Sequence, residues 1–175
     1  MLQKGNSRIG IINFDAHFDL RPLENQPHSG TPFNQILSEY GSNTEYFVLG
    51  IQQPANTQEL FAIAKEKEVN FLFNDVCENI NYELVASKLH AFIKRNDALY
   101  LTIDLDGFSS AYAPGVSAPS PMGFSPAFAF KILHFLMQTQ KVVAVDIAEL
   151  NPRYDRNQST AVLAARIVNA VVGGL

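Results

Sequence analysis

The residues most suited to chemistry form the run Asp15-Ala16-His17-Phe18-Asp19, in which two carboxylates and an imidazole occupy alternate positions. Side chains of these types are ligands of divalent cations. Asp104 and Asp106 repeat the alternate spacing, and Glu149 adds another carboxylate further along the chain. The Asp-x-His-x-Asp pattern is the more specific signal, because single carboxylates often serve as helix caps or ion-pair partners. The sequence therefore predicts a cation site centred on residues 15–19.

Bringing these acidic groups together without a cation would be unfavourable. A carboxylate that leaves water without a partner loses much of its solvation, and no lysine lies within or beside the acidic motifs. An all-oxygen site suits magnesium or calcium, whereas an imidazole ligand shifts the preference towards manganese, iron or zinc. Two cations that share carboxylates can activate water for hydrolysis. We therefore predict one or two divalent cations and hydrolytic chemistry.

Each acidic motif follows an apolar run of the kind that forms a buried strand. These runs are residues 9–14, 98–103 and 141–147. Strands that are apolar throughout are typical of a parallel sheet covered on both faces, and such sheets bind ligands at the carboxyl ends of their strands. The three motifs are therefore expected to meet at one edge of one sheet.

Strand and helix patterns alternate along the rest of the chain. Further strands are expected at 46–51 and 69–73, and helices at 33–40, 57–67, 126–138 and 159–172. A long amphipathic helix is expected after residue 73, with an inner face made of Leu84, Leu89, Phe92 and Ile93. Segments 20–31 and 106–124 are rich in turn residues and are expected to be loops. The predicted fold class is α/β with a mainly parallel sheet.

The composition favours a globular, cytoplasmic protein. The chain has 175 residues, of which 47% are hydrophobic and 17% charged, and its formal net charge is -4. Without a basic block, neither nucleic acid nor an anionic membrane is an expected partner. The single cysteine, Cys77, fits a reducing compartment, and residues 1–6 lack the apolar core of a signal peptide. The expected partner is a small-molecule substrate, and the sequence leaves a homo-oligomer open.

Together the motifs resemble those of the ureohydrolase family of arginases, agmatinases and formimidoylglutamases. The resemblance rests on residues 13–19, 102–106 and 146–152 and on the proline-rich run 113–119. It implies an arginase-like, three-layer αβα fold with a doubly wound sheet, and a centre of two Mn²⁺ ions. The implied metal ligands are Asp15, His17, Asp19, Asp104 and Asp106. Asp106 is also implied to be catalytic, and Glu149 to be catalytic and to hold the cationic amidine or guanidine end of the substrate.

Residues 20–22 and 29–33 most resemble the formimidoylglutamase branch of this family. That branch hydrolyses N-formimidoyl-L-glutamate to L-glutamate and formamide in histidine degradation. The resemblance places Arg21 and Ser29 among the substrate-binding residues. Arg21 lies two positions after a predicted metal ligand, and its planar guanidinium suits a substrate carboxylate. An ion pair between Arg21 and Glu24, or another local acid, is the alternative that the sequence leaves open.

Members of the family are longer, and their first metal-binding motif is a Gly-rich segment with a histidine ligand. Nothing before Arg8 matches this motif. We therefore expect residues 1–175 to form a single arginase-like domain that is incomplete at its N-terminus, with one metal lacking a histidine. Two other functions stay open. One is an agmatinase or guanidinobutyrase type of ureohydrolase, and the other is an inactive metal-binding module.

Overall fold

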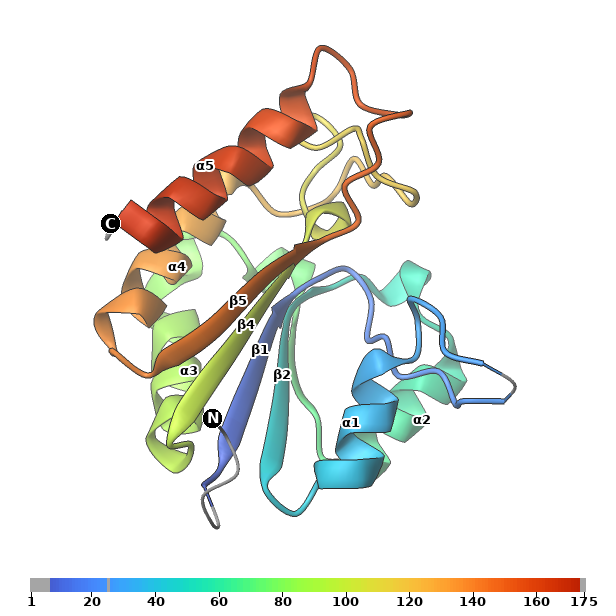
Figure 1. Cartoon of the computed structure of the whole chain (residues 1–175), viewed down its shortest axis with the longest axis vertical. Helices are drawn as coiled ribbons and strands as arrows, with labels where there is room; N and C mark the ends of the chain where they lie inside the picture. The colour runs from blue at the N-terminus through green and yellow to red at the C-terminus, as the bar shows by residue number, and fades with distance from the viewer. Residues whose placement is uncertain (1–6, 25, 174–175) are drawn as a thin grey trace.

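A parallel five-stranded sheet forms the centre of the computed structural model, which describes residues 7–24 and 26–173 (Figure 1). The strand order is β3-β2-β1-β4-β5, and every neighbouring pair is parallel. The strands are β1 (Ile9–Phe14), β2 (Thr44–Ile51), β3 (Asn70–Phe73), β4 (Ala98–Asp104) and β5 (Val142–Ala148). Residues 1–6, which were compared with a signal peptide, lie outside the described part.

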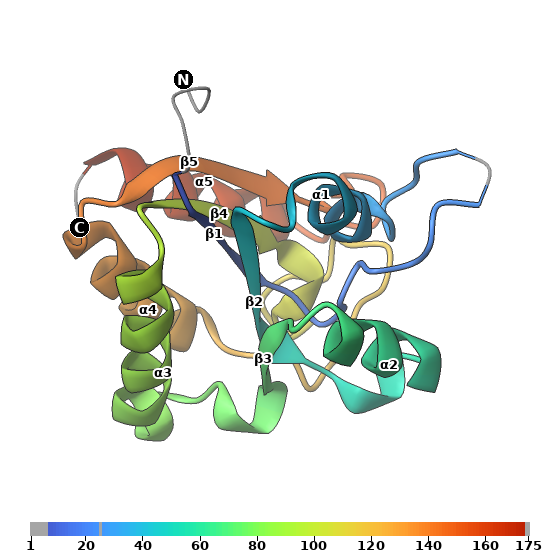
Figure 2. The same cartoon turned by 90° about the horizontal axis from the view of Figure 1, so that it is seen from below.

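Helices cover both faces of the sheet, so the chain folds into three layers (Figures 1 and 2). The helices are α1 (Pro32–Tyr40), α2 (Gln58–Glu66), α3 (Tyr82–Arg95), α4 (Pro126–Gln138) and α5 (Ser159–Gly173). Helices α1 and α2 pack on one face, and α3, α4 and α5 pack on the other. This arrangement confirms the predicted α/β class with a doubly wound, parallel sheet.

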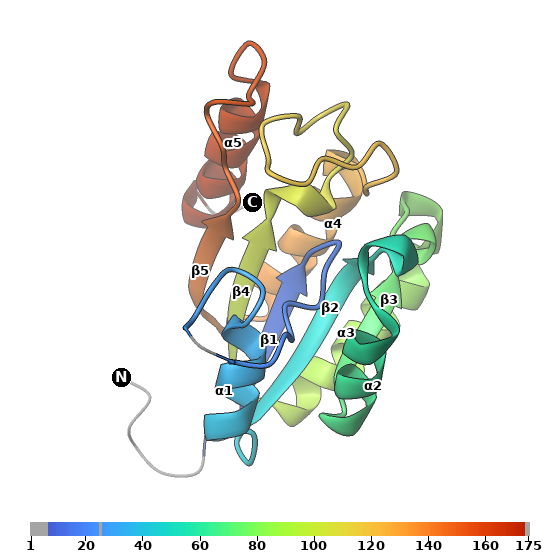
Figure 3. The same ribbon diagram turned by 90° about the vertical axis from the view of Figure 1, so that its right-hand side faces the viewer.

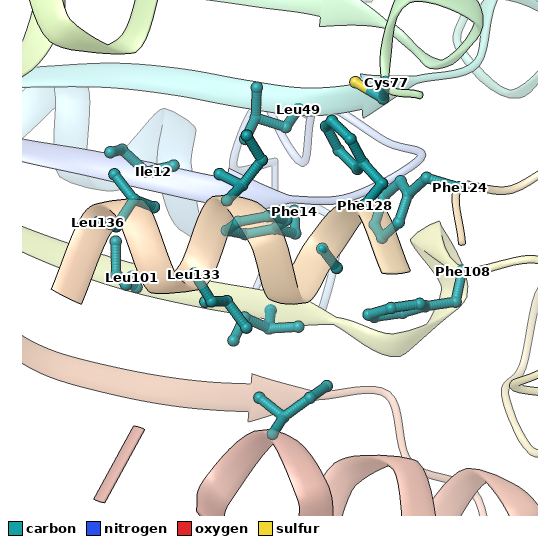
Figure 4. Packing of buried hydrophobic residues seen from close by; sticks show 14 of the residues in the cluster. Ile12, Phe14, Leu49, Cys77, Leu101, Phe108, Phe124, Phe128, Leu133 and Leu136 are labelled. Carbon is teal, nitrogen blue, oxygen red and sulfur yellow. The ribbon is translucent and has the colours of Figure 1, made fainter. Parts of the chain in front are cut away.

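Alternation along β1 divides its side chains between two hydrophobic clusters. Ile12 and Phe14 face the larger cluster with α3, α4 and α5, whereas Ile11 faces the smaller cluster with α1 and α2. In the larger cluster, Phe14, Phe124 and Phe128 pack between α4 and the sheet (Figure 4). Both faces of this central strand are thus buried, which explains why its sequence is apolar apart from Asn13.

The start of α4 follows a simple local rule. Ser125 is the N-cap, and its hydroxyl accepts a hydrogen bond of 3.2 Å from the Phe128 N–H. Pro126 occupies the first turn, where a missing N–H costs nothing. The sequence predicted this helix start correctly.

The predicted inner face of α3 was wrong at one position. Leu84 is 50% exposed, whereas the buried residues of this helix are Val85, Ala86, Leu89, Phe92 and Ile93. At helical spacing, Leu84 lies on the same side as Lys88 and Arg95, which are exposed. The small residues Val85 and Ala86 face the sheet instead, because they lie in phase with Leu89 and Phe92.

β5 forms an open edge of the sheet. It pairs with β4 on one side, and within the described residues no strand pairs with its other side. Val143 in this strand is 60% exposed, and Val168 and Val172 of the adjacent α5 are 51% and 80% exposed. An apolar edge of this kind favours pairing with another strand. In the described ranges, no helix has the length and apolar character required to cross a bilayer.

Candidate metal centre

The carboxyl ends of β1, β4 and β5 lie side by side, and the predicted site residues follow them directly (Figure 3). Phe14 in β1 pairs with Ile103 in β4, so the next residues, Asp15 and Asp104, leave neighbouring strands at the same level. Asp104 in turn pairs with Ala148 in β5, and Glu149 comes next. The register of the sheet therefore places all three acidic motifs at one edge.

The two Asp motifs turn in the same way after their strands. The Asp15 Oδ1 accepts a hydrogen bond of 2.7 Å from the His17 N–H, and the Asp104 Oδ1 accepts one of 2.9 Å from the Asp106 N–H. Each first aspartate therefore folds the chain back over its own carboxylate. The side chains two positions later, His17 and Asp106, therefore stay near these carboxylates because of the turn and not because of an extended chain.

Buried supports hold residues 15–19 in this turn. The Asn56 side chain accepts a hydrogen bond of 3.0 Å from the Phe18 N–H and donates one of 2.9 Å to the Ala16 carbonyl oxygen. The absence of a side chain at Gly107 allows its backbone to pack closely against Phe124 and Asp15, because a Cβ atom there would lie 2.8 Å from the Phe124 ring and 3.1 Å from the Asp15 Cα. The position of Asp15 is thus fixed by packing from behind.

The five predicted metal ligands form two groups that share one residue. Donor atoms of Asp15, His17 and Asp106 lie within 4.8 Å of one another, and so do those of Asp15, Asp19 and Asp104. The His17 Nδ1 is 3.2 Å from the Asp106 Oδ2 and 3.4 Å from the Asp15 Oδ1. A carboxylate that belongs to both groups is suited to bridge two cations.

The crowded carboxylates make this edge of the sheet unfavourable for negative charge. Burial raises the pKa of Asp15 to about 6, that of Asp19 to about 8 and that of Asp104 to about 10, and repulsion between neighbouring carboxylates adds to each shift. Hydrogen bonds to Asp106 and Asp15 raise the pKa of His17 to about 11. The acidic group therefore requires positive charge close by.

The residues fit divalent cations by a second criterion. The Asp106 Oδ1 is buried, and no hydrogen bond reaches it within the part of the chain that the structure describes. A buried carboxylate oxygen without a donor is rare unless a cation or water binds it. Carboxylate oxygens with one imidazole nitrogen suit manganese, iron or zinc better than magnesium or calcium.

The predicted substrate-binding residues border the same cleft. A cleft of about 170 Å³ is lined by Arg21, Ser29 and Glu149 together with His17, Asp19 and Asp106. Arg21 is exposed and forms no ion pair among residues 7–24 and 26–173. The ion pair with Glu24, which the sequence left open, is therefore absent from these residues. The cleft therefore presents a guanidinium at its mouth and carboxylates within.

Two further cleft residues were missed by sequence reasoning. The Ser117 hydroxyl donates a hydrogen bond of 2.6 Å to the Glu149 Oε2, although the two residues are 32 positions apart. His28 also borders the cleft. It lies in a tight turn, in which its carbonyl oxygen accepts a hydrogen bond of 3.0 Å from the Thr31 N–H. No local pattern predicts the Ser117 contact, and within segment 20–31 only Arg21 and Ser29 were predicted to bind substrate.

Two of the acidic cleft residues have left-handed backbone conformations. Asp19 has φ of 50° and Glu149 has φ of 63°. Residues other than glycine rarely adopt this region, and its cost is commonly found at functional sites. Six non-glycine residues of the described chain have a positive φ, and two of them are these carboxylates of the same cleft.

Comparison with known proteins agrees with these motifs. The sequence matches the family model described as Arginase family over residues 1–173. The chain belongs to the arginase family. It is 44% identical over 161 residues to a formimidoylglutamase of Staphylococcus aureus (strain JH9), a match that covers 92% of this chain and 51% of that protein. The chain thus spans about half the length of the curated relatives it matches.

Solved structures of the same family share the fold. The formimidoylglutamase of Bacillus subtilis subsp. subtilis str. 168 superposes with a TM-score of 0.88 and 27% identity, over 95% of this chain and 53% of that one. An arginase from Bacillus subtilis gives a TM-score of 0.83 at 22% identity, over 95% and 63% of the two chains. The arginase-like fold predicted from the motifs is therefore confirmed.

Proposed function

We propose that this chain carries the site for Mn²⁺-dependent hydrolysis of a C–N bond in a linear amidine, with N-formimidoyl-L-glutamate as substrate. The observation that carries the proposal is the pair of candidate cation groups sharing Asp15, in a cleft with Arg21 at its mouth. The similarity to formimidoylglutamase supports the choice of substrate within the family.

Two Mn²⁺ ions would be held by the two groups described above. Asp15, His17 and Asp106 would hold one, and Asp15, Asp19 and Asp104 the other. When bound, the ions supply hydrolytic chemistry by making water a better nucleophile near neutral pH. His17 must bind as the neutral imidazole, so cation binding releases a proton from it.

Glu149 and Arg21 orient the two ends of the substrate. The amidine end is cationic, and the Glu149 carboxylate can accept its N–H groups through one oxygen while the Ser117 hydroxyl holds the other. The glutamate end carries two carboxylates, and the Arg21 guanidinium can bind one of them with two parallel hydrogen bonds. Agmatine has no carboxylate, so Arg21 favours the acidic substrate.

Asp106 is placed to assist the chemical step. Its buried Oδ1, to which no described residue donates a hydrogen bond, can accept a hydrogen bond from the attacking water and so orient it. Water then adds to the amidine carbon, and the bond from that carbon to the glutamate nitrogen breaks. The products are formamide, which keeps the oxygen of the added water, and L-glutamate, whose nitrogen takes up both protons of that water and leaves as an ammonium group.

Substrate competition tests the proposal. Hydrolysis of formimidoylglutamate, agmatine and arginine is measured with added Mn²⁺, and ammonia, urea and formamide are quantified separately. We expect formamide release from formimidoylglutamate to be faster than urea release from either guanidine. Faster hydrolysis of agmatine or arginine would contradict this choice of substrate and would instead assign a ureohydrolase that acts on guanidines.

A second candidate is a metal-binding module without turnover. The group formed by Asp15, Asp19 and Asp104 has three carboxylates and no imidazole among the described residues, and the chain spans half the length of its relatives. This candidate predicts weak binding or a single Mn²⁺ per chain. Titration calorimetry combined with the turnover assay separates the two, since two tight sites with hydrolysis exclude it.

A further inference from the structure

A polar side chain occupies an otherwise apolar position beneath the candidate metal centre. Asn13 lies in β1 on the face that packs against α1 and α2, and it is 1% exposed. Its neighbour on that face, Ile11, belongs to the hydrophobic cluster. An amide in such a place needs hydrogen-bond partners to offset its loss of water.

The Asn13 amide donates in two directions. Its Nδ2 is 2.9 Å from the Asp15 Oδ2 and 2.9 Å from the Tyr46 hydroxyl oxygen. The Tyr46 hydroxyl in turn donates to the Phe18 carbonyl oxygen at 3.2 Å. The chain of hydrogen bonds therefore begins at the carboxylate shared by both cation groups and ends on the backbone beside Asp19.

The two oxygens of the Asp15 carboxylate have different partners. Asn13 engages the Oδ2, whereas the Oδ1 is the atom that lies 3.4 Å from the His17 Nδ1. Rotation of the carboxylate would break the buried hydrogen bond, so the Asn13 amide fixes which oxygen faces His17. Such supporting contacts orient metal ligands and tune their affinity.

The amide does this at a cost. The Asn13 Oδ1 is buried and finds no hydrogen-bond partner within the described residues. A leucine of similar size would avoid that cost, and it would also remove the donor to Asp15. The Asn13 side chain therefore combines an unfavourably buried Oδ1 with an Nδ2 that donates to Asp15, a predicted metal ligand.

From these contacts we propose that Asn13 and Tyr46 are positioning residues that hold the Asp15 carboxylate ready to bridge two Mn²⁺ ions. The proposal rests on the metal centre described above. Asn13 acts on Asp15 directly, and Tyr46 acts through Asn13 and through the Phe18 carbonyl. Tyr46 is itself held by stacking on Phe33, with 4.4 Å between the ring centroids.

The test is Mn²⁺ titration calorimetry of the whole chain and of the variants Asn13→Leu and Tyr46→Phe. Ile11→Val is the matched control, because it perturbs packing on the same strand and face without removing a donor. We expect Asn13→Leu to weaken Mn²⁺ binding by about 10- to 100-fold, Tyr46→Phe to weaken it less, and Ile11→Val to leave it unchanged. The thermal midpoint of the metal-free proteins is measured in parallel.

A double-mutant cycle separates positioning from general stability. If Tyr46 acts mainly through Asn13, Tyr46→Phe has little further effect on Mn²⁺ affinity in the Asn13→Leu background. Unchanged affinity in Asn13→Leu, or an equal loss in Ile11→Val, overturns the proposal. If Asn13→Leu does not fold, unchanged affinity in Tyr46→Phe overturns it. Failure of the unaltered chain to bind Mn²⁺ overturns the metal centre itself, a distinct outcome.

Discussion

Replacing Asp104 with asparagine should stabilise the metal-free protein while it weakens metal binding. The pKa of Asp104 is raised to about 10 in the folded chain, first by burial and then by repulsion from Asp15 and Asp106. The unfolded chain has a pKa of about 3.9 for this group, so the folded state keeps a proton that the unfolded state loses. The free energy of unfolding of the metal-free protein therefore falls as the pH rises from about 4 to about 10.

The size of the effect follows from the distances in the site. Donor atoms of Asp15, Asp19 and Asp104 lie within 4.8 Å of one another. At an effective dielectric constant of about 20, two unit charges at that separation repel by about 3.5 kcal/mol. Proton uptake by Asp104 in the folded chain relieves part of this repulsion. We therefore expect Asp104→Asn to increase the free energy of unfolding of the metal-free protein by about 2 kcal/mol at pH 8, which corresponds to about 4 to 8 °C in the thermal midpoint.

The assay is thermal unfolding in a chelator at pH 5 and pH 8. Asparagine keeps the oxygen that accepts the Asp106 N–H, so the turn is preserved. Asp75→Asn is the matched control, because it removes an exposed carboxylate outside the site and should leave the midpoint unchanged. We expect the gain for Asp104→Asn to be larger at pH 8 than at pH 5. A metal-free variant no more stable than the unaltered chain at pH 8 would refute this electrostatic reasoning.

Three other predictions concern binding and assembly. Asp15→Asn should lose both Mn²⁺ ions, whereas Asp19→Asn should lose one, as measured by calorimetric stoichiometry; equal losses would contradict a shared ligand. Arg21→Glu should raise KM for formimidoylglutamate by about 10- to 100-fold through a lost charged hydrogen bond, and leave any agmatine hydrolysis unaffected; steady-state kinetics with both substrates decides this. Val143→Lys should reduce any self-association through the open edge of β5, measured by analytical ultracentrifugation; the same association state in the variant would exclude that edge.

The strands and the site were predictable because their signals are local. Short, mainly apolar runs such as 9–14 are typical of buried strands in a covered sheet, and acidic residues directly after such strands lie at its carboxyl end. The helix start at Ser125-Pro126 is likewise encoded in adjacent residues. Metal ligation by these residues stays a prediction.

The remaining features depend on contacts between distant residues. Ser117 reaches Glu149 across 32 positions, and Asn13 meets Tyr46 across 33. No periodicity in the sequence reports such pairs, because they exist only after the sheet register is set. The error at Leu84 has a different cause. The buried face of α3 begins one residue later than predicted, so Val85 is buried and the larger Leu84 is exposed.

The central claim is that two cations bind at the strand ends and share Asp15. Anomalous diffraction from crystals grown with Mn²⁺ tests it most directly. We predict two manganese peaks, one bound by Asp15, His17 and Asp106 and the other by Asp15, Asp19 and Asp104. Absence of manganese from these positions, or a single ion that does not touch Asp15, would contradict the claim.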